Sequence, residues 1–122
     1  MNRQILKTSI TLDMKKSRIR IHKSLYYSLG QPKYVQLLVN PKDRKIGIKS
    51  VEFSSAFAQP IKVSTQKTVD KSYELYSSTL LNKLYDELQL LDENSSYRIE
   101  GIVSVDEKVA LFSFDTIERI TI

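Results

Sequence analysis

The sequence predicts an α+β fold, in which one small strand-rich domain is built from two similar halves, each a strand, a helix and a hairpin. Short runs of alternating polar and apolar residues recur along the chain, and this is the period of half-buried strands. Only two segments show helical spacing of apolar residues. The two segments occupy equivalent places, since each follows a strand and precedes a hairpin.

The first two strands are predicted to form a β-hairpin. After an end at Met1–Lys7 that we expect to be loose, Ser9–Met14 alternates cleanly, and Arg18–Ile21 returns after a polar turn. The second of these strands would send its two isoleucines into the core and its two arginines to the outside. The inward pair is Ile19 and Ile21, and the outward pair is Arg18 and Arg20.

A short helix and a second hairpin complete the first half. Leu25 and Leu29 are four residues apart, which places them on one face of a helix, and Gly30 is suited to end it because it takes positive φ at little cost. Two apolar-rich strands follow, joined by a turn that Asn40–Pro41 initiates. We expect these strands at residues 34–39 and 46–51.

The second half repeats this order after a Ser/Thr-rich crossover at residues 53–71, for which we predict one short strand at Ile61–Val63. A strand at Tyr73–Tyr76 leads into the best-marked helix, at Thr79–Leu91. Its buried face is expected to consist of Leu81, Leu84, Tyr85 and Leu88. A hairpin with strands at 97–103 and 109–114 comes next, and residues 117–122 are expected to add an edge strand.

The two halves align as an internal repeat. The final hairpins align without gaps, matching Tyr34 with Tyr97, Asp43 with Asp106, Lys45 with Lys108 and Ser50 with Ser113. The strand and helix align at a smaller shift, matching Ile19 with Tyr73, Ile21 with Leu75, Leu25 with Leu80 and Leu29 with Leu84. The repeat predicts a fused pseudo-dimer, in which neither half buries its strands alone.

Composition narrows the class of protein. A length of 122 residues predicts a single domain spanning 1–122. The chain has no Cys, which excludes thiolate chemistry and fits a cytoplasmic location, and no apolar run is long enough to span a membrane. His22 is the only histidine and the three Gly are not clustered, so we expect no metal, no cofactor and no enzymatic activity.

Charge is distributed unevenly along the chain. Residues 1–62 carry 13 Lys and Arg against 3 Asp and Glu, a net charge of +10, whereas residues 63–122 carry 6 against 11, a net charge of −5. The basic half is expected at 1–52 and the acidic half at 72–122. This asymmetry favours a binding surface on the first half, and it is equally compatible with two halves that attract each other.

A basic strip is the strongest candidate site. It consists of Lys15, Lys16, Arg18, Arg20 and Lys23. Such a strip would neutralise nucleic-acid phosphates, and Tyr26 and Tyr27 beside it would stack on bases or anchor a protein partner. A solvated strand edge is the remaining interpretation, since Lys and Arg also guard exposed strands.

The run from Ile10 through Val51 resembles the swapped-hairpin DNA-binding domains of AbrB, MazE and SpoVT type. The resemblance rests on an arginine-led strand at residues 18–23, a helix ending Leu-Gly at 29–30, and the hairpin at 34–49. It implies a small barrel and DNA contact through the matching basic positions Lys15, Lys16, Arg18, Arg20 and Lys23. Ser17 and His22 depart from the Gly and Pro usual in that family, and the second half lacks the basic strand, since Ser72 and Glu74 stand where the first half has arginines.

Two functions follow as expectations. The first is a nucleic-acid-binding regulator of AbrB-like type, either a transcription regulator or an antitoxin, with DNA or RNA as partner. The second is a phage or mobile-element protein that binds and inhibits a host defence nuclease or ribonucleoprotein, as anti-CRISPR proteins do. A palindromic operator needs two equivalent basic faces, so a fused chain would have to form a homodimer or bind an asymmetric partner.

Overall fold

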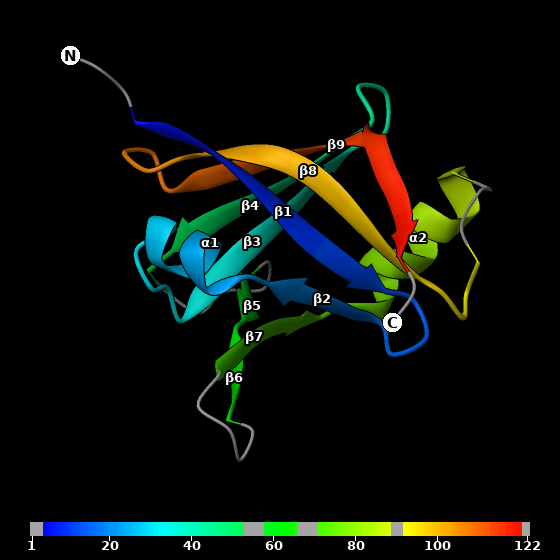
Figure 1. The fold of residues 1–122 in the computed structure, drawn as a ribbon, viewed down its shortest axis with the longest axis horizontal. Coiled ribbons are helices and arrows are strands. Elements are labelled where there is room, and N and C mark those ends of the chain that lie inside the picture. Colours follow the sequence, from blue (N-terminus) through cyan, green and yellow to red (C-terminus); the bar gives the residue numbers. More distant parts are fainter. Residues whose placement is uncertain (1–3, 53–57, 66–70, 89–91, 121–122) are drawn as a thin grey trace.

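The computed structural model describes residues 4–52, 58–65, 71–88 and 92–120, and within them the chain forms nine strands and two helices (Figure 1). In chain order these are β1 (Ile5–Asp13), β2 (Arg18–Ile21), α1 (Lys23–Ser28), β3 (Tyr34–Asn40), β4 (Lys45–Val51), β5 (Ala58–Pro60), β6 (Lys62–Thr65), β7 (Lys71–Tyr76), α2 (Ser78–Leu88), β8 (Ser96–Ser104) and β9 (Val109–Ile120).

All nine strands belong to one antiparallel sheet that is nearly closed into a barrel. The strand order is β5-β3-β4-β9-β8-β1-β2-β7-β6. The two strands at its ends, β5 and β6, are separated in the chain by Ile61 alone, so the same short segment pairs with β3 on one side and with β7 on the other. The sheet therefore joins its own two edges, which otherwise would offer unpaired backbone groups.

The core fills the inside of this barrel and confirms the predicted alternation. Ile19 and Ile21 of β2 are buried, as are alternating apolar residues of β1, β4, β8 and β9. The helices add leucines to the same cluster: Leu25 and Leu29 from the α1 region, and Leu80, Leu81 and Leu84 from α2. The small strand-rich α+β domain predicted from the period of apolar residues is thus observed.

Local signals explain where the helices begin and end. Gly30 has a φ of +84° and its N–H donates to the carbonyl of Tyr27, so the left-handed residue that ends α1 is present as predicted. At the start of α2, the Ser77 hydroxyl accepts a hydrogen bond from the Leu80 N–H at 3.2 Å. This is the capping interaction that a serine before a helix commonly makes.

The two chain ends differ from the prediction. Residues 5–7 were expected to be loose, but they pair with 102–104 as the beginning of β1. For the expected edge strand at 117–122, residues 117–120 are in a strand as predicted, but as the continuation of β9, which shifts register after Ser113 and pairs again with β8, Ser96 lying opposite Ile120. Residues 121–122 lie outside the described residues. At both ends the segment pairs with the long strand β8. The alternation of apolar residues within the segment is too weak to have predicted this pairing.

The buried face of α2 also differs from the prediction. Leu81 and Leu84 are buried, but Tyr85 is 41% exposed. The buried stripe is formed by Leu80, Leu81 and Leu84 and is centred near Leu84, and Tyr85 lies about a quarter turn away from that centre. The side chain of Leu88, and all of Leu91, lie outside the described residues.

The crossover contributes more to the sheet than predicted. In place of one strand at Ile61–Val63, two short strands lie on either side of Ile61. The N–H of Ile61 donates to the carbonyl of Lys33 at 3.0 Å, which fixes the point where the segment passes from β3 to β7. The parts of the crossover at 53–57 and 66–70 lie outside the described residues.

Candidate nucleic-acid interface

The candidate interface is the outward face of three neighbouring strands, β2, β7 and β6. Arg20 lies opposite Glu74, and Glu74 lies opposite Lys62, so the three residues form a row across the strands. Arg18 lies opposite Tyr76 in the next row. Partners across a ladder point to the same side of the sheet, and the residues between them point into the core. These five residues define the basic face.

Arg18 occupies the inner part of the basic face and is held by two carboxylates. Its Nη2 lies 2.8 Å from Oδ2 of Asp13 and its Nη1 lies 3.4 Å from Oε1 of Glu74. Burial lowers the pKa of Arg18, but the hydrogen bond to Asp13 and the charges of Glu74 and Asp13 outweigh it and raise that pKa overall. Arg18 was predicted to face outward and contact phosphate; it does lie on the outer face of β2, but its guanidinium is already engaged.

Glu74 is the centre of this network, and its carboxylate is buried although it lies on the outer face of the sheet. The hydroxyl of Tyr76 donates to Oε2 of Glu74 at 2.6 Å, and this hydrogen bond raises the pKa of Tyr76. Nζ of Lys62 lies 5.0 Å from the centre of the Tyr76 ring, within the range of a cation–π contact. The carboxylate of Glu74 thus fixes the position of the Tyr76 ring, and Lys62 lies over that ring.

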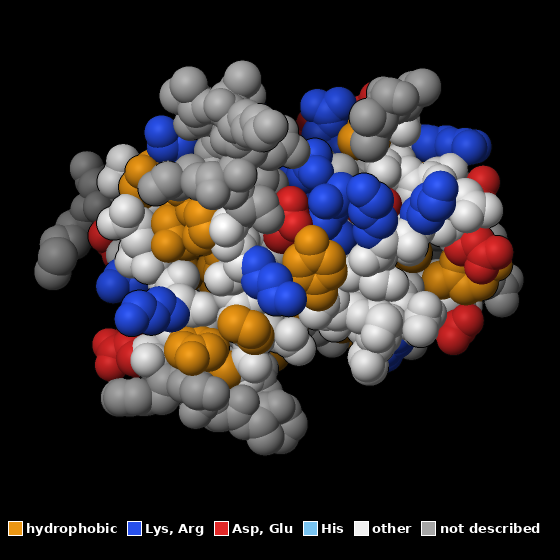
Figure 2. Space-filling model, turned by 90° about the horizontal axis from the view of Figure 1, so that it is seen from below, with side chains coloured by type: hydrophobic (Ala, Val, Ile, Leu, Met, Phe, Trp, Pro, Cys, Tyr) orange, Lys and Arg blue, Asp and Glu red, His pale blue; other side chains and the backbone are white. Residues whose placement is uncertain are grey.

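Besides Arg18, several cations on the basic face or near it in the chain are exposed to solvent. The side chain of Arg20 is 42% exposed against 14% for Arg18, and its Nη2 is 4.0 Å from Glu74. Exposed lysines lie at the turn between β1 and β2, at the start of α1 and on β6: Lys15, Lys16, Lys23 and Lys62. Figure 2 shows Lys and Arg side chains spread over the side of the molecule on which β6 and β7 lie, several of them gathered near the middle.

The two predicted tyrosines differ in what they are able to bind. Tyr26 is stacked on the largely buried Tyr73, with ring centres 4.0 Å apart and planes 17° apart, so one face of its ring is already covered. Tyr27 is exposed, and Nζ of Lys23 lies 5.8 Å from its ring centre. Of the pair, Tyr27 is the one that presents a free surface to a ligand.

The structure therefore places Arg18 and Arg20 of the predicted strip together and adds residues of β6 and β7 to them. Lys15 and Lys16 lie in the turn that joins β1 to β2, and Lys23 and Tyr27 lie in α1, which follows β2. Sequence reasoning did not find Lys62, Glu74 or Tyr76 as members of this site. The alternation of β7 already placed Glu74 and Tyr76 on its outer face, but only the pairing of β7 with β2 puts them beside the arginines.

A second feature is a broad hollow of about 780 Å³ bordered by residues of β1, β8, β9 and β4. Its charged lining is Lys7, Lys45, Arg98 and Glu100, and His22 lies at its border.

Within the described ranges no group of three or more His, Cys, Asp or Glu residues is arranged to hold a metal ion. Neither helix, as far as the chain is described, is long and apolar enough to cross a membrane.

Comparison of the chain with protein-family models, with curated proteins and with solved structures gives no match. What the protein binds has therefore to be inferred from its own residues, and the basic face is the arrangement with the most definite chemistry.

Proposed function

We propose that this protein is a non-enzymatic nucleic-acid-binding regulator of AbrB-like type, and that its basic face contacts the phosphate backbone. The observation that carries the proposal is the placement of Arg20 and Lys62 on either side of one buried carboxylate, Glu74, which Arg18 already pairs. The charges of Arg20 and Lys62 consequently remain available to a polyanion, and Lys15 and Lys16 add two more beside them.

The order of the strands supports the AbrB-like part of the proposal. Exchanging β1 with the β5–β6 segment, β2 with β7, β3 with β8 and β4 with β9 leaves the order around the barrel unchanged. Two of these counterpart pairs, β2 with β7 and β4 with β9, are themselves paired antiparallel. This is the arrangement expected of two repeats that combine around a two-fold axis, as the resemblance of the first half implies.

In this proposal the residues have different roles. Arg18 positions the face, because it links Asp13 of β1 to Glu74 of β7. Arg20, Lys62 and the lysines of the β1–β2 turn contact phosphates. Because backbone contacts supply affinity without reading base edges, the proposal concerns binding to nucleic acid in general and the register of the protein on it.

The test is the salt dependence of binding to a duplex of about 30 base pairs, measured by fluorescence anisotropy. Contact with about four phosphates gives a slope of roughly −3 to −4 in a plot of log affinity against log salt. Arg20→Ala and Lys62→Ala should each make this slope shallower by about one unit. Single-stranded DNA and duplex RNA, run in the same series, identify the preferred polymer.

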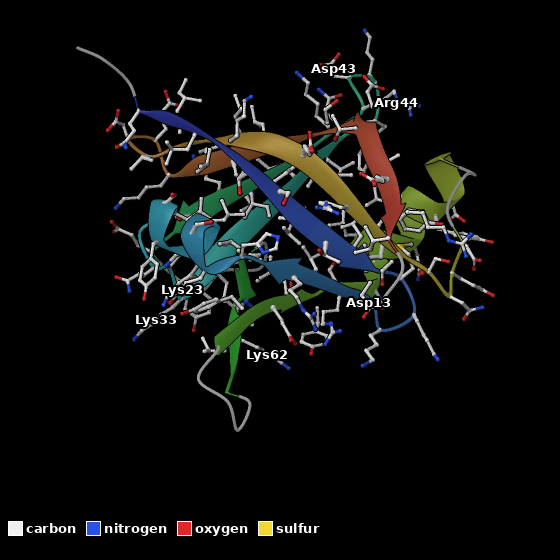
Figure 3. All side chains as sticks on the ribbon, viewed as in Figure 1. Asp13, Lys23, Lys33, Asp43, Arg44 and Lys62 are labelled. Carbon is white, nitrogen blue, oxygen red and sulfur yellow. The ribbon has the colours of Figure 1, made fainter. Side chains whose placement is uncertain are left out.

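The matched control is Lys42→Ala, which also removes one exposed lysine. It lies in the β3–β4 turn together with Asp43 and Arg44, at the end of the molecule away from Lys62 (Figure 3). The slope of log affinity against log salt for Lys42→Ala should equal that of the wild type. A wild-type slope near zero, or equal slopes for all three variants, would refute the proposal. Capture of a host nuclease under the same conditions would instead favour the inhibitor function.

A further inference from the structure

We propose that the outward face of β4, β9 and β8 binds a second copy of this chain and forms a two-fold symmetric dimer. On this face a row of residues crosses four strands: Leu38 lies opposite Gly47, Gly47 opposite Leu111, and Leu111 opposite Ile102. We call these four residues the apolar row. Their neighbours along the strands, such as Ile46 and Phe112, are buried in the core, so the row faces away from it.

The three large residues of the apolar row are exposed, and Gly47 is buried between two of them. The exposed fractions of Leu38, Leu111 and Ile102 are 44%, 45% and 46%. A Cβ built on Gly47 would lie 3.4 Å from Cδ2 of Leu111 and 3.5 Å from Cβ of Leu38, so these two leucines stand on either side of the glycine. Large apolar side chains that lie together on a surface are typical of an interaction site.

A row of opposite charges runs beside the apolar row. Lys45 and Glu100 each lie opposite Ser113, one on β4 and the other on β8. They are thus two strand spacings apart, about 10 Å, and on either side of β9. In the described part of the chain neither side chain takes part in an ion pair.

The parts of these two rows that lie on β4, β9 and β8 are complementary to themselves, which is why the occupant we propose is a second copy. A two-fold axis along β9 exchanges the positions of β4 and β8. It places Ile102 of one copy over Gly47 of the other, between Leu38 and Leu111, and it places Glu100 of one copy over Lys45 of the other. The two copies of Leu111 then face each other on the axis, where the hollow that Leu111 and Ile102 line in one copy opens onto that of the other. Each contact occurs twice, as in an isologous interface.

The dimer goes beyond the proposed function and does not depend on it. In the strand order, β9 is four strands from β7 in either direction when β5 and β6 are counted as one segment, so the apolar row is across the barrel from the basic face. A dimer through the apolar row therefore leaves both basic faces accessible. Two such faces are what a palindromic nucleic-acid site would require.

The experiment is sedimentation velocity without nucleic acid, over a range of protein concentrations. The wild type should be a dimer, and Leu111→Asp should be a monomer. Lys45→Glu and Glu100→Lys should each weaken the dimer by about tenfold or more, because each places like charges opposite each other twice. The double variant Lys45→Glu/Glu100→Lys restores opposite charges and should return to the wild-type association constant.

Lys83→Glu is the control for a change of charge on an exposed lysine, because Lys83 lies on α2 and not on the strands of the interface, and this variant should associate as the wild type does. Circular dichroism establishes that each variant is folded, and the charge-reversal pair keeps the test decisive even if Leu111→Asp does not fold. A monomeric wild type, or a double variant as weak as its two parents, would overturn the dimer. Since no nucleic acid is present, that failure is separate from any failure of DNA binding.

Discussion

Arg18 and Glu74 face each other across neighbouring strands, with Nη1 of the arginine 3.4 Å from Oε1 of the carboxylate. They belong to the two halves of opposite net charge, and Arg44 with Asp115 forms another ion pair between those halves. The uneven distribution of charge along the chain therefore serves, in part, to join the halves. The cations that this pairing leaves more exposed, such as Arg20 and Lys62, are the ones proposed to bind nucleic acid.

The first prediction concerns the unequal roles of the two arginines in stability. Arg18→Ala leaves the buried carboxylates of Asp13 and Glu74 without their main cation, and should lower the free energy of unfolding by about 3–5 kcal/mol. Arg20→Ala removes a longer and more exposed contact, and should cost less than about 1 kcal/mol. The free energies of unfolding are measured by urea melts of both variants. Equal decreases for the two variants would contradict the assignment of Arg18 as the residue that positions the basic face.

The second prediction concerns the packing of α2. Leu84 is almost fully buried among the core residues, so Leu84→Ala should destabilise the fold by about 2–5 kcal/mol. Asn82→Ala, on the exposed side of the same helix, should change stability by no more than about 0.5 kcal/mol. Both are measured by denaturant melts at one protein concentration. A loss below about 0.5 kcal/mol for Leu84→Ala would mean that this face of α2 does not belong to the core.

The third prediction concerns Gly101, where β8 comes close to β9. A Cβ at this position would overlap the carbonyl oxygen of Leu111 and lie 2.7 Å from Cδ1 of Phe112. Because a backbone atom is in the way, Gly101→Ala should cost about 3 kcal/mol or more. Gly47→Ala is the matched control, since its Cβ meets other atoms at ordinary distances, and in dilute solution it should be tolerated. Identical melting temperatures for the two variants would refute the close approach.

The fourth prediction concerns alkaline pH. The hydrogen bond to Glu74 raises the pKa of Tyr76 in the folded protein, so folding favours the protonated phenol. The resulting stabilisation is complete below the unfolded pKa of about 10 and is lost as the pH rises through the higher folded value. The difference in unfolding free energy between wild type and Tyr76→Phe should therefore be constant to about pH 9 and shrink above about pH 10. A difference that grows as the pH rises would show that folding does not raise the pKa of Tyr76.

Neighbouring strands and short helices were readable from the sequence because their signals are local. The alternation of Ile19 and Ile21 gave the inward face of β2, the spacing of Leu81 and Leu84 gave one side of α2, and Gly30 marked the end of α1. Each of these depends on side chains a few residues apart. For these residues the period of apolar side chains was enough to predict the buried face, whereas it failed for Tyr85.

Only the tertiary structure decided which distant segments meet. Pairing of β2 with β7 buries Glu74 and turns Arg18 from an expected phosphate ligand into the partner of two carboxylates, and the β5–β6 segment brings Lys62 to the same face. The apolar row likewise exists only because β3, β4, β9 and β8 lie side by side in one register. The sequence by itself determined the faces of its strands and helices, whereas the ligands those faces offer were decided by long-range register, which depends on the packing of the whole barrel.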